Sequence, residues 1–197
     1  MNPFRSKRLL YRAPEDNPTE DAFIHTMYGD PLVGCMVSSA LQRPLSTVER
    51  KELRKEIQTR LFVSFVICKI PEPEEDTAEN EPQPIGEISL KAPKPGTAHN
   101  RCLELGISIA TKHQGQGYGT EAISWLLDWS FLTAGLHRVE LTVFDWNERA
   151  RKVYERIGFV QEGIRRESIW KDGRWWDLIQ MGILEHEWAA KKKAISS

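Results

Sequence analysis

A glycine-rich turn between an apolar strand and an amphipathic helix most limits how this chain can fold. The turn reads Gln114-Gly115-Gln116-Gly117-Tyr118-Gly119-Thr120, after a strand-like run over 103–110. A helical pattern of apolar residues follows, at Ile123, Leu126, Leu127 and Phe131. Glycines allow positive φ and a close approach of the backbone to a ligand. Backbone N–H groups and the positive end of the helix dipole meet at such a turn, so the sequence predicts a phosphate-binding site.

The spacing of this turn differs from two common nucleotide-binding patterns. No Gly-Lys-Ser/Thr follows it, which excludes a Walker A loop, and G-x-G-x-x-G is absent. The pattern here is Gln-x-x-Gly-x-Gly. Because a glycine-rich turn can also simply end a strand, the functional interpretation needs a second motif.

That second motif covers residues 147–159 and predicts a short helix that stops at a glycine. Asp145 or Asn147 can cap its start, and Gly158 suits the left-handed position just after a helix. The apolar or aromatic residues share one face through spacings of three and four: Ala150, Val153, Tyr154 and Ile157. The charged residues between them fall largely on the other, solvated face.

Together the two motifs resemble those of the GNAT superfamily, the N-acetyltransferases that use acetyl-CoA. The resemblance implies that the backbone of 114–120 holds the pyrophosphate of the cofactor. It also implies that Asn147 and the nearby helix backbone at Ala150 contact the cofactor, while the Tyr154 hydroxyl protonates the leaving thiolate. Without the glycine-rich loop upstream, Tyr154 would be interpreted as an ordinary half-buried aromatic ring with a structural role.

The family also suggests how the strand before the loop is used. Its members splay the fourth and fifth strands apart, which leaves backbone N–H groups as oxyanion donors. Carried over, Ile109 donates to the thioester carbonyl, and Ile107 and Ser108 line the acetyl group. A fixed donor of this kind typically contributes about 3 kcal/mol to lowering the barrier.

The general base has two candidates. An amine that arrives protonated must lose a proton before it attacks, and carboxylates commonly accept it. Glu104 stands first because it matches a frequent GNAT position, and Glu87 stands second. Each can equally be a solvent-facing strand residue without a catalytic role.

Composition favours an ordinary globular protein. With 197 residues, 40% hydrophobic and 28% charged, we expect one N-acetyltransferase domain over 1–197, with its core at about 8–185. The formal net charge of −1 does not indicate a nucleic-acid surface. We expect no membrane span, no secretory signal, no metal site and a cytoplasmic location, with Cys35, Cys68 and Cys102 reduced.

The order of elements predicts the fold. Strands are expected near 8–12, 61–68, 85–90, 103–109, 137–144, 159–170 and 175–184, with helices at 16–29, 46–60, after the loop and at 147–157. The first helix is expected to break at Gly29-Asp30-Pro31, and Ser46 with Glu49 resembles a capping box at the start of the second. Asp172-Gly173 predicts a type I′ hairpin turn. The acidic, proline-containing stretch 71–84 is expected to be a mobile loop. This order matches the GNAT fold, an α+β (mixed α/β) architecture with a twisted mixed sheet of about seven strands and helices on both faces.

Three questions of function stay open. The ending 170–184 resembles the branch of ribosomal-protein N-terminal acetyltransferases, although members of that branch often lack the tyrosine matching Tyr154. The expected activity is acetyl transfer from acetyl-CoA, used as co-substrate, to a primary amine by direct attack in a ternary complex. The alternatives are a catalytically silent acyl-CoA-binding module, or transfer to oxygen or of a longer acyl group. Trp170 and Trp175 beside the hairpin could wall an acceptor site or form a homodimer contact.

Overall fold

The computed structural model describes residues 2–41, 43–44, 46–71 and 81–196. The chain forms two compact units. The N-terminal unit contains Met1–Leu90 and Gly106–Trp125, and the C-terminal unit contains Lys91–Leu105 and Leu126–Ser197. The acidic loop expected at 71–84 falls mainly on residues 72–80, which lie outside the described residues. The single domain predicted over 1–197 stays a prediction.

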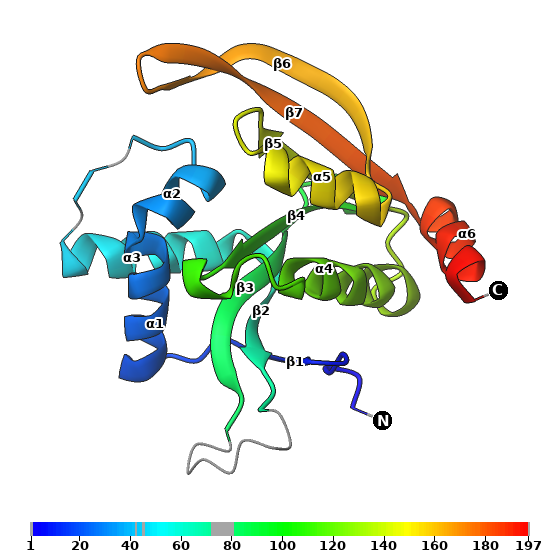
Figure 1. The fold of residues 1–197 in the computed structure, drawn as a ribbon, viewed down its shortest axis with the longest axis horizontal. Coiled ribbons are helices and arrows are strands. Elements are labelled where there is room, and N and C mark those ends of the chain that lie inside the picture. The colour runs from blue at the N-terminus through cyan, green and yellow to red at the C-terminus, as the bar shows by residue number, and fades with distance from the viewer. Residues whose placement is uncertain (1, 42, 45, 72–80, 197) are drawn as a thin grey trace. The chain divides into compact units, whose positions relative to one another are not determined.

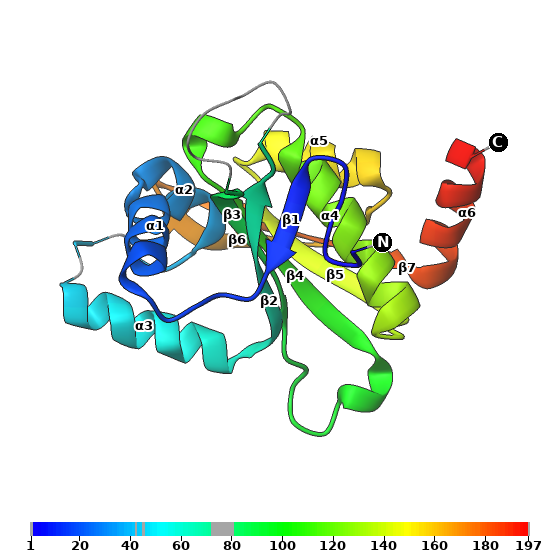
Figure 2. The ribbon, with the colours of Figure 1, turned by 90° about the horizontal axis from the view of Figure 1, so that it is seen from below.

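The strands of the N-terminal unit are β1 (Leu9–Arg12), β2 (Leu61–Lys69), β3 (Gln83–Lys91, with its last residue in the other unit) and the second half of β4 (Cys102–Ile109). β1 and β2 are antiparallel neighbours, with Leu9 opposite Lys69 and Arg12 opposite Val66 (Figure 2). Apolar side chains of these strands form the core, including the fully buried residues Leu9, Val66, Ile67, Ile85, Ile88 and Leu90. Their burial follows from the β-branched and aliphatic composition of the strands.

The helices of this unit begin at side-chain caps. α1 (Pro18–Gly29) is capped by Asn17, and α3 (Thr47–Thr59) starts with the predicted capping box of Ser46 and Glu49. A helix that the sequence analysis missed, α2 (Pro31–Val37), lies between them. The break expected at Gly29-Asp30-Pro31 is also the start of this helix. The Asp30 side chain accepts from the Leu32 amide and Pro31 occupies the first turn, so the same residues end one helix and start the next.

The N-terminal unit also holds most of α4 (Tyr118–Asp128), the helix after the glycine-rich loop. Trp125 of α4 stacks on Tyr11 of β1 with a centroid distance of 3.6 Å, and Phe65 of β2 meets it edge-on at 5.0 Å. The Trp125 indole N–H donates to the Pro3 carbonyl at 3.0 Å. These aromatic contacts join the helix to β1 and β2, and so they place the loop that precedes the helix.

The C-terminal unit is built on a long hairpin, β6 (Val160–Lys171) and β7 (Arg174–Leu184), which leads into α6 (Glu185–Ser196) in Figure 1. Its turn has positive φ at Asp172 (52°) and Gly173 (76°), which confirms the predicted type I′ turn. β7 pairs antiparallel with β5 (Arg138–Phe144), and β5 pairs parallel with the start of β4. α5 (Glu148–Ile157) follows β5. α6 was not predicted.

The strands hydrogen-bond in the order β1-β2-β3-β4-β5-β7-β6. This seven-stranded mixed sheet with its helices confirms the predicted fold class. The three cysteines are free, with Cys68 fully buried on β2 and the other two half-buried. Over the described part of the chain, no helix combines the length and apolarity that crossing a bilayer requires.

Candidate cofactor loop and active-site residues

The glycine-rich loop turns the chain sharply from β4 into α4. After β4 ends at Ile109, a short 3₁₀ turn (Thr111–His113) precedes Gln114, whose backbone is extended. Gly115 and Gly117 then take φ values of 81° and 83°, and α4 begins at Tyr118. Only glycine adopts such values without strain, so the two glycines are required by the turn itself.

The amides at the start of α4 are available to a ligand. The Glu121 amide bonds to the Gly117 carbonyl at 3.1 Å, so the amides of residues 118–120 precede the first helical hydrogen bond. Space is also open there. A Cβ placed on Gly119 would have no heavy atom of the described residues within 4 Å, apart from its chain neighbours and the backbone of its own helix. An anion at this helix end therefore meets N–H donors and the positive end of the dipole.

Both glutamines of the loop fold back onto the backbone. The Gln114 side-chain amide donates to the Ile109 carbonyl at 2.9 Å, and the Gln116 amide donates to the Lys112 carbonyl at 3.1 Å. The first bond ties the loop to the end of β4, where Ile107, Ser108 and Ile109 are expected to line the acetyl group. The structure thus brings the predicted pyrophosphate loop and the predicted acetyl-lining strand together in one unit.

Arg8 and Glu121 hold this loop from the side, and sequence reasoning missed them. The Arg8 guanidinium donates to the Gln116 carbonyl at 3.0 Å and lies 4.5 Å from the centre of the Tyr118 ring. Glu121 accepts from Arg8 Nε at 2.8 Å, from the Arg8 amide at 2.7 Å and from Ser6 at 2.7 Å. These hydrogen bonds outweigh desolvation and lower the pKa of Glu121. Arg8 thereby fixes the peptide between Gln116 and Gly117.

We predict that Arg8→Ala weakens acetyl-CoA binding about tenfold, because the loop loses two charge-assisted contacts that hold its shape. Isothermal titration calorimetry with acetyl-CoA measures the change. Lys7→Ala is the control, since it removes an exposed positive charge from the neighbouring residue. Equal loss of affinity in both variants would mean that only net charge matters, and that Arg8 does not position the loop.

The second motif lies in the C-terminal unit, on α5. Asn147 is its N-cap, with its side-chain oxygen accepting from the Ala150 amide at 3.2 Å, and Gly158 ends it at φ 118°. Both local predictions are confirmed. Tyr154 packs edge-on against Phe159 at 5.9 Å, and burial raises its pKa to about 12. The phenol of Tyr154 therefore stays protonated at neutral pH, as a proton donor must.

The two candidate bases occupy different environments. Glu104 accepts from Lys91 Nζ at 2.5 Å and from Thr142 Oγ1 at 3.5 Å, all within the C-terminal unit. Glu87, in the N-terminal unit, accepts from the Tyr28 hydroxyl at 3.0 Å, and burial raises its pKa. Glu104 is thus paired with a cationic lysine, whereas the donor to Glu87 is a neutral hydroxyl. No group of three or more possible metal ligands occurs within the described part of the chain.

Comparison with known proteins places these features in a family. The acetyltransferase (GNAT) domain model matches residues 8–160, more than half of the chain. The spermidine N(1)-acetyltransferase of Vibrio cholerae is 38% identical over 89 residues, which are 45% of this chain and 51% of that protein. YdaF of Bacillus subtilis, named provisionally as a ribosomal N-acetyltransferase, is 37% identical over 93 residues (47% and 51%). The chain spans about half the length of the curated relatives it matches.

A solved structure extends the likeness over nearly the whole chain. The spermidine N-acetyltransferase of Vibrio cholerae in complex with CoA and spermine gives a TM-score of 0.74 at 28% identity, covering 93% of this chain and 99% of that chain. The fold is therefore that of the acetyltransferase (GNAT) domain. The chain belongs to the GNAT acetyltransferase family.

Proposed function

We propose that this protein transfers the acetyl group of acetyl-CoA to a primary amine by direct attack in a ternary complex. The observation that carries the proposal is the open row of amides at the start of α4, directly after the strand that ends at Ile109. That row suits a diphosphate, and the strand lies one short turn away from it. The family model and the solved relative in complex with CoA support the same chemistry.

The roles of individual residues are part of the proposal. Amides of Gln114–Thr120 hold the pyrophosphate, the Ile109 N–H donates to the thioester carbonyl, and Ile107 and Ser108 line the acetyl group. On α5, Asn147 and Ala150 belong to the cofactor-binding set, and Tyr154 protonates the departing thiolate. The free-energy benefit of a backbone donor does not depend on its side chain, so Ile109→Ala need not abolish activity.

We propose a cationic amine of the polyamine class as acceptor, with spermidine as the first to test. Relatives at 38% and 31% identity are spermidine N(1)-acetyltransferases, and the matching crystal structure contains spermine. A peptide N-terminus is the second candidate, since YdaF points to ribosomal proteins. We further propose a cytoplasmic location, supported by three free cysteines, and a homo-oligomer, in line with the dodecamer formed by one relative.

Thiol release from acetyl-CoA in the presence of spermidine, other amines and peptide N-termini tests the activity directly. We expect spermidine to accelerate release. Tight acetyl-CoA binding without transfer to any acceptor or to protein extract would instead identify a silent acyl-CoA-binding module. Absence of both binding and release would reject the proposed function altogether.

Tyr154→Phe is expected to lower kcat about 100-fold, the usual contribution of a positioned general acid, while the Kd for acetyl-CoA changes little. Steady-state kinetics and calorimetry measure the two quantities. Tyr11→Phe is the matched control, because it removes the hydroxyl of a buried tyrosine that bonds to Ser6 on the β1 side. A normal kcat in Tyr154→Phe would remove the phenol from the mechanism.

A further inference from the structure

Three polar side chains from three elements of the N-terminal unit lie close together. The Tyr28 hydroxyl of α1 donates to Glu87 Oε2 of β3 at 3.0 Å. The Ser108 side chain on β4 is near enough to influence the pKa of the same hydroxyl, and a Cβ on Gly86, next to Glu87, would lie 2.3 Å from the Ser108 carbonyl oxygen. Ser108 is only 7% exposed, and Glu87 is half-buried. Since Ser108 belongs to the strand segment proposed to line the acetyl group, Glu87 lies next to that segment.

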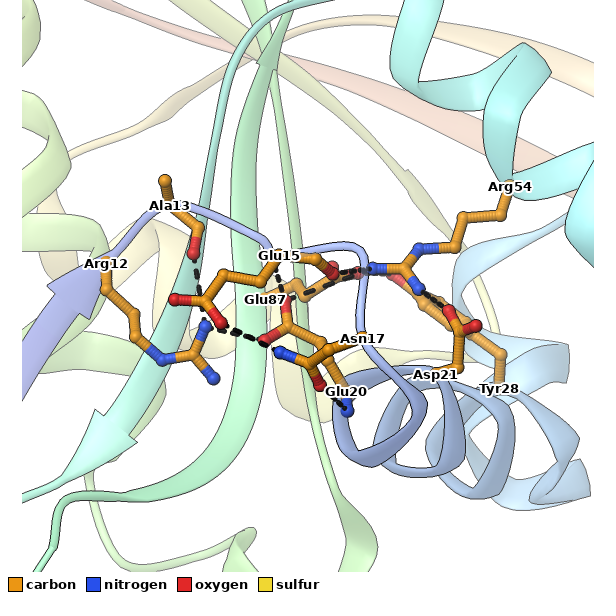
Figure 3. Close-up of polar contacts among 9 residues, drawn as sticks. All are labelled: Arg12, Ala13, Glu15, Asn17, Glu20, Asp21, Tyr28, Arg54 and Glu87. Atoms are coloured by element: carbon orange, nitrogen blue, oxygen red, sulfur yellow. Dashed lines mark hydrogen bonds and ion pairs between the residues drawn. The ribbon is translucent and has the colours of Figure 1, made fainter.

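Glu87 differs from the other carboxylates around it. In Figure 3, ion pairs run from Arg12 through Glu20 to Arg54 and Asp21. Glu20, with a side chain only 1% exposed, is bonded by Arg12 at 2.5 Å and by the Glu15 amide at 2.9 Å. The arginines are therefore already engaged. Within the described residues, no lysine or arginine forms an ion pair with Glu87, whose donor is the neutral Tyr28 hydroxyl.

The surroundings of Glu87 make its carboxylate basic. Burial is the largest influence and raises the pKa, and the charge of Glu20 on α1 adds to the rise. The Tyr28 hydrogen bond and the positive charge of Arg54 on α3 act in the opposite direction but do not cancel it. A carboxylate whose pKa lies nearer neutrality accepts a proton from an amine more effectively.

We propose that Glu87 is the catalytic residue that takes the proton from the acceptor's ammonium group, with Tyr28 as its positioning residue. This inference rests on the proposed N-acetyltransferase function and assigns the base to β3 in place of Glu104. Glu104 already has the Lys91 ammonium as partner at 2.5 Å, which occupies the carboxylate. The substrate class that fits Glu87 is a cationic primary amine.

The acceptor nitrogen gives up one proton before it attacks and a second one afterwards. The ammonium gives one proton to the Glu87 carboxylate, which becomes a neutral acid, and the freed lone pair forms the new C–N bond. The C–S bond breaks and the electron pair stays on sulfur. The nitrogen then passes its second surplus proton to water. The thiolate takes a proton from Tyr154 and leaves as the thiol, and Tyr154 regains a proton from water. Glu87 returns its proton to water before the next turnover.

The test compares pH profiles of kcat/KM with spermidine for the wild type, Glu87→Gln, Glu104→Gln and Tyr28→Phe. We expect kcat/KM of Glu87→Gln to fall about 100-fold. The acid limb of the pH profile, which is the decrease of kcat/KM as the base becomes protonated at low pH, should disappear in this variant. Tyr28→Phe removes a hydrogen bond that favours the ionised carboxylate, so the acid limb should move to higher pH, which a structural role would not cause. Glu56→Gln, on the exposed face of α3, is the control and should behave as the wild type.

If the fall of kcat/KM at low pH survives in Glu87→Gln and disappears in Glu104→Gln, the inference is overturned.

Calorimetric titration of spermidine into the acetyl-CoA-free protein tests the Glu87 inference separately from the proposed function, because binding needs no turnover. We expect at least tenfold weaker spermidine binding in Glu87→Gln than in Glu56→Gln. If the wild type binds spermidine but acetylates no amine, the proposed function fails while the Glu87 contact stands. Equal affinities of the two variants would reject the contact itself.

Discussion

Replacing Gly119 by aspartate is expected to abolish acetyl-CoA binding while the protein stays folded. Gly119 lies in the first turn of α4, has room for a side chain, and is not among the glycines with positive φ. An aspartate there interacts favourably with the helix dipole, so the fold should not suffer. Its carboxylate, however, occupies the position expected for the diphosphate. Opposed like charges cost several kcal/mol, which corresponds to at least about a 100-fold loss of affinity.

Gly119→Asn separates charge from size in this experiment. Asparagine has nearly the same shape as aspartate but no charge, so its loss of affinity should be much smaller. Calorimetry with acetyl-CoA gives the Kd of each variant, and thermal unfolding shows whether both remain folded. If Gly119→Asp binds acetyl-CoA as well as Gly119→Asn, the amides at the start of α4 do not hold the diphosphate.

Local patterns in the sequence were sufficient to predict most elements. The capping box at Ser46, the glycine that ends α5 and the Asp172-Gly173 turn each depend on neighbours a few residues away, and each is confirmed. α2 was missed because its cap, Asp30, and its first proline also look like a break. α6 was missed because its charged sequence gives almost no apolar periodicity, and tertiary contacts with β7 support it instead.

The shape of the glycine-rich loop could be predicted because consecutive residues determine it. The groups that hold or tune the site could not, because they come from distant positions. Arg8 meets Glu121 across 113 residues, and Tyr28 meets Glu87 across 59. Contacts between distant positions also bear on the choice between the two candidate general bases. Sequence reasoning ranked Glu104 above Glu87 on family position, but the lysine beside the first and the tyrosine beside the second are visible only in three dimensions.

Gly86→Ala should be among the most destabilising single substitutions in the N-terminal unit. A Cβ at this position would lie 2.3 Å from the Ser108 carbonyl oxygen and 3.2 Å from the Ile109 Cα. Both are backbone atoms of β4, so the strands themselves must move apart. We expect the free energy of unfolding to fall by about 3 kcal/mol, at the upper end for overpacking. Urea denaturation measures this change.

Gly29→Ala provides the comparison, because a Cβ on Gly29 has open space around it. Its stability should stay within about 0.5 kcal/mol of the wild type, so that any larger effect of Gly86→Ala comes from the close approach of β3 to β4. Wild-type stability in Gly86→Ala would show that the two strands can separate at little cost.

The close approach at Gly86 also links stability to function. Gly86 precedes Glu87 on β3, and the atoms it would displace belong to Ser108 and Ile109, the proposed acetyl-lining residues. Moving β4 away from β3 therefore disturbs both the proposed oxyanion donor and the placing of Ser108 beside Tyr28 and Glu87. At a temperature where Gly86→Ala is still folded, kcat should fall more than the affinity for acetyl-CoA, because the amides of α4 that we propose as the diphosphate site are not displaced. An equal loss in both quantities would mean that the loop moves together with the strand.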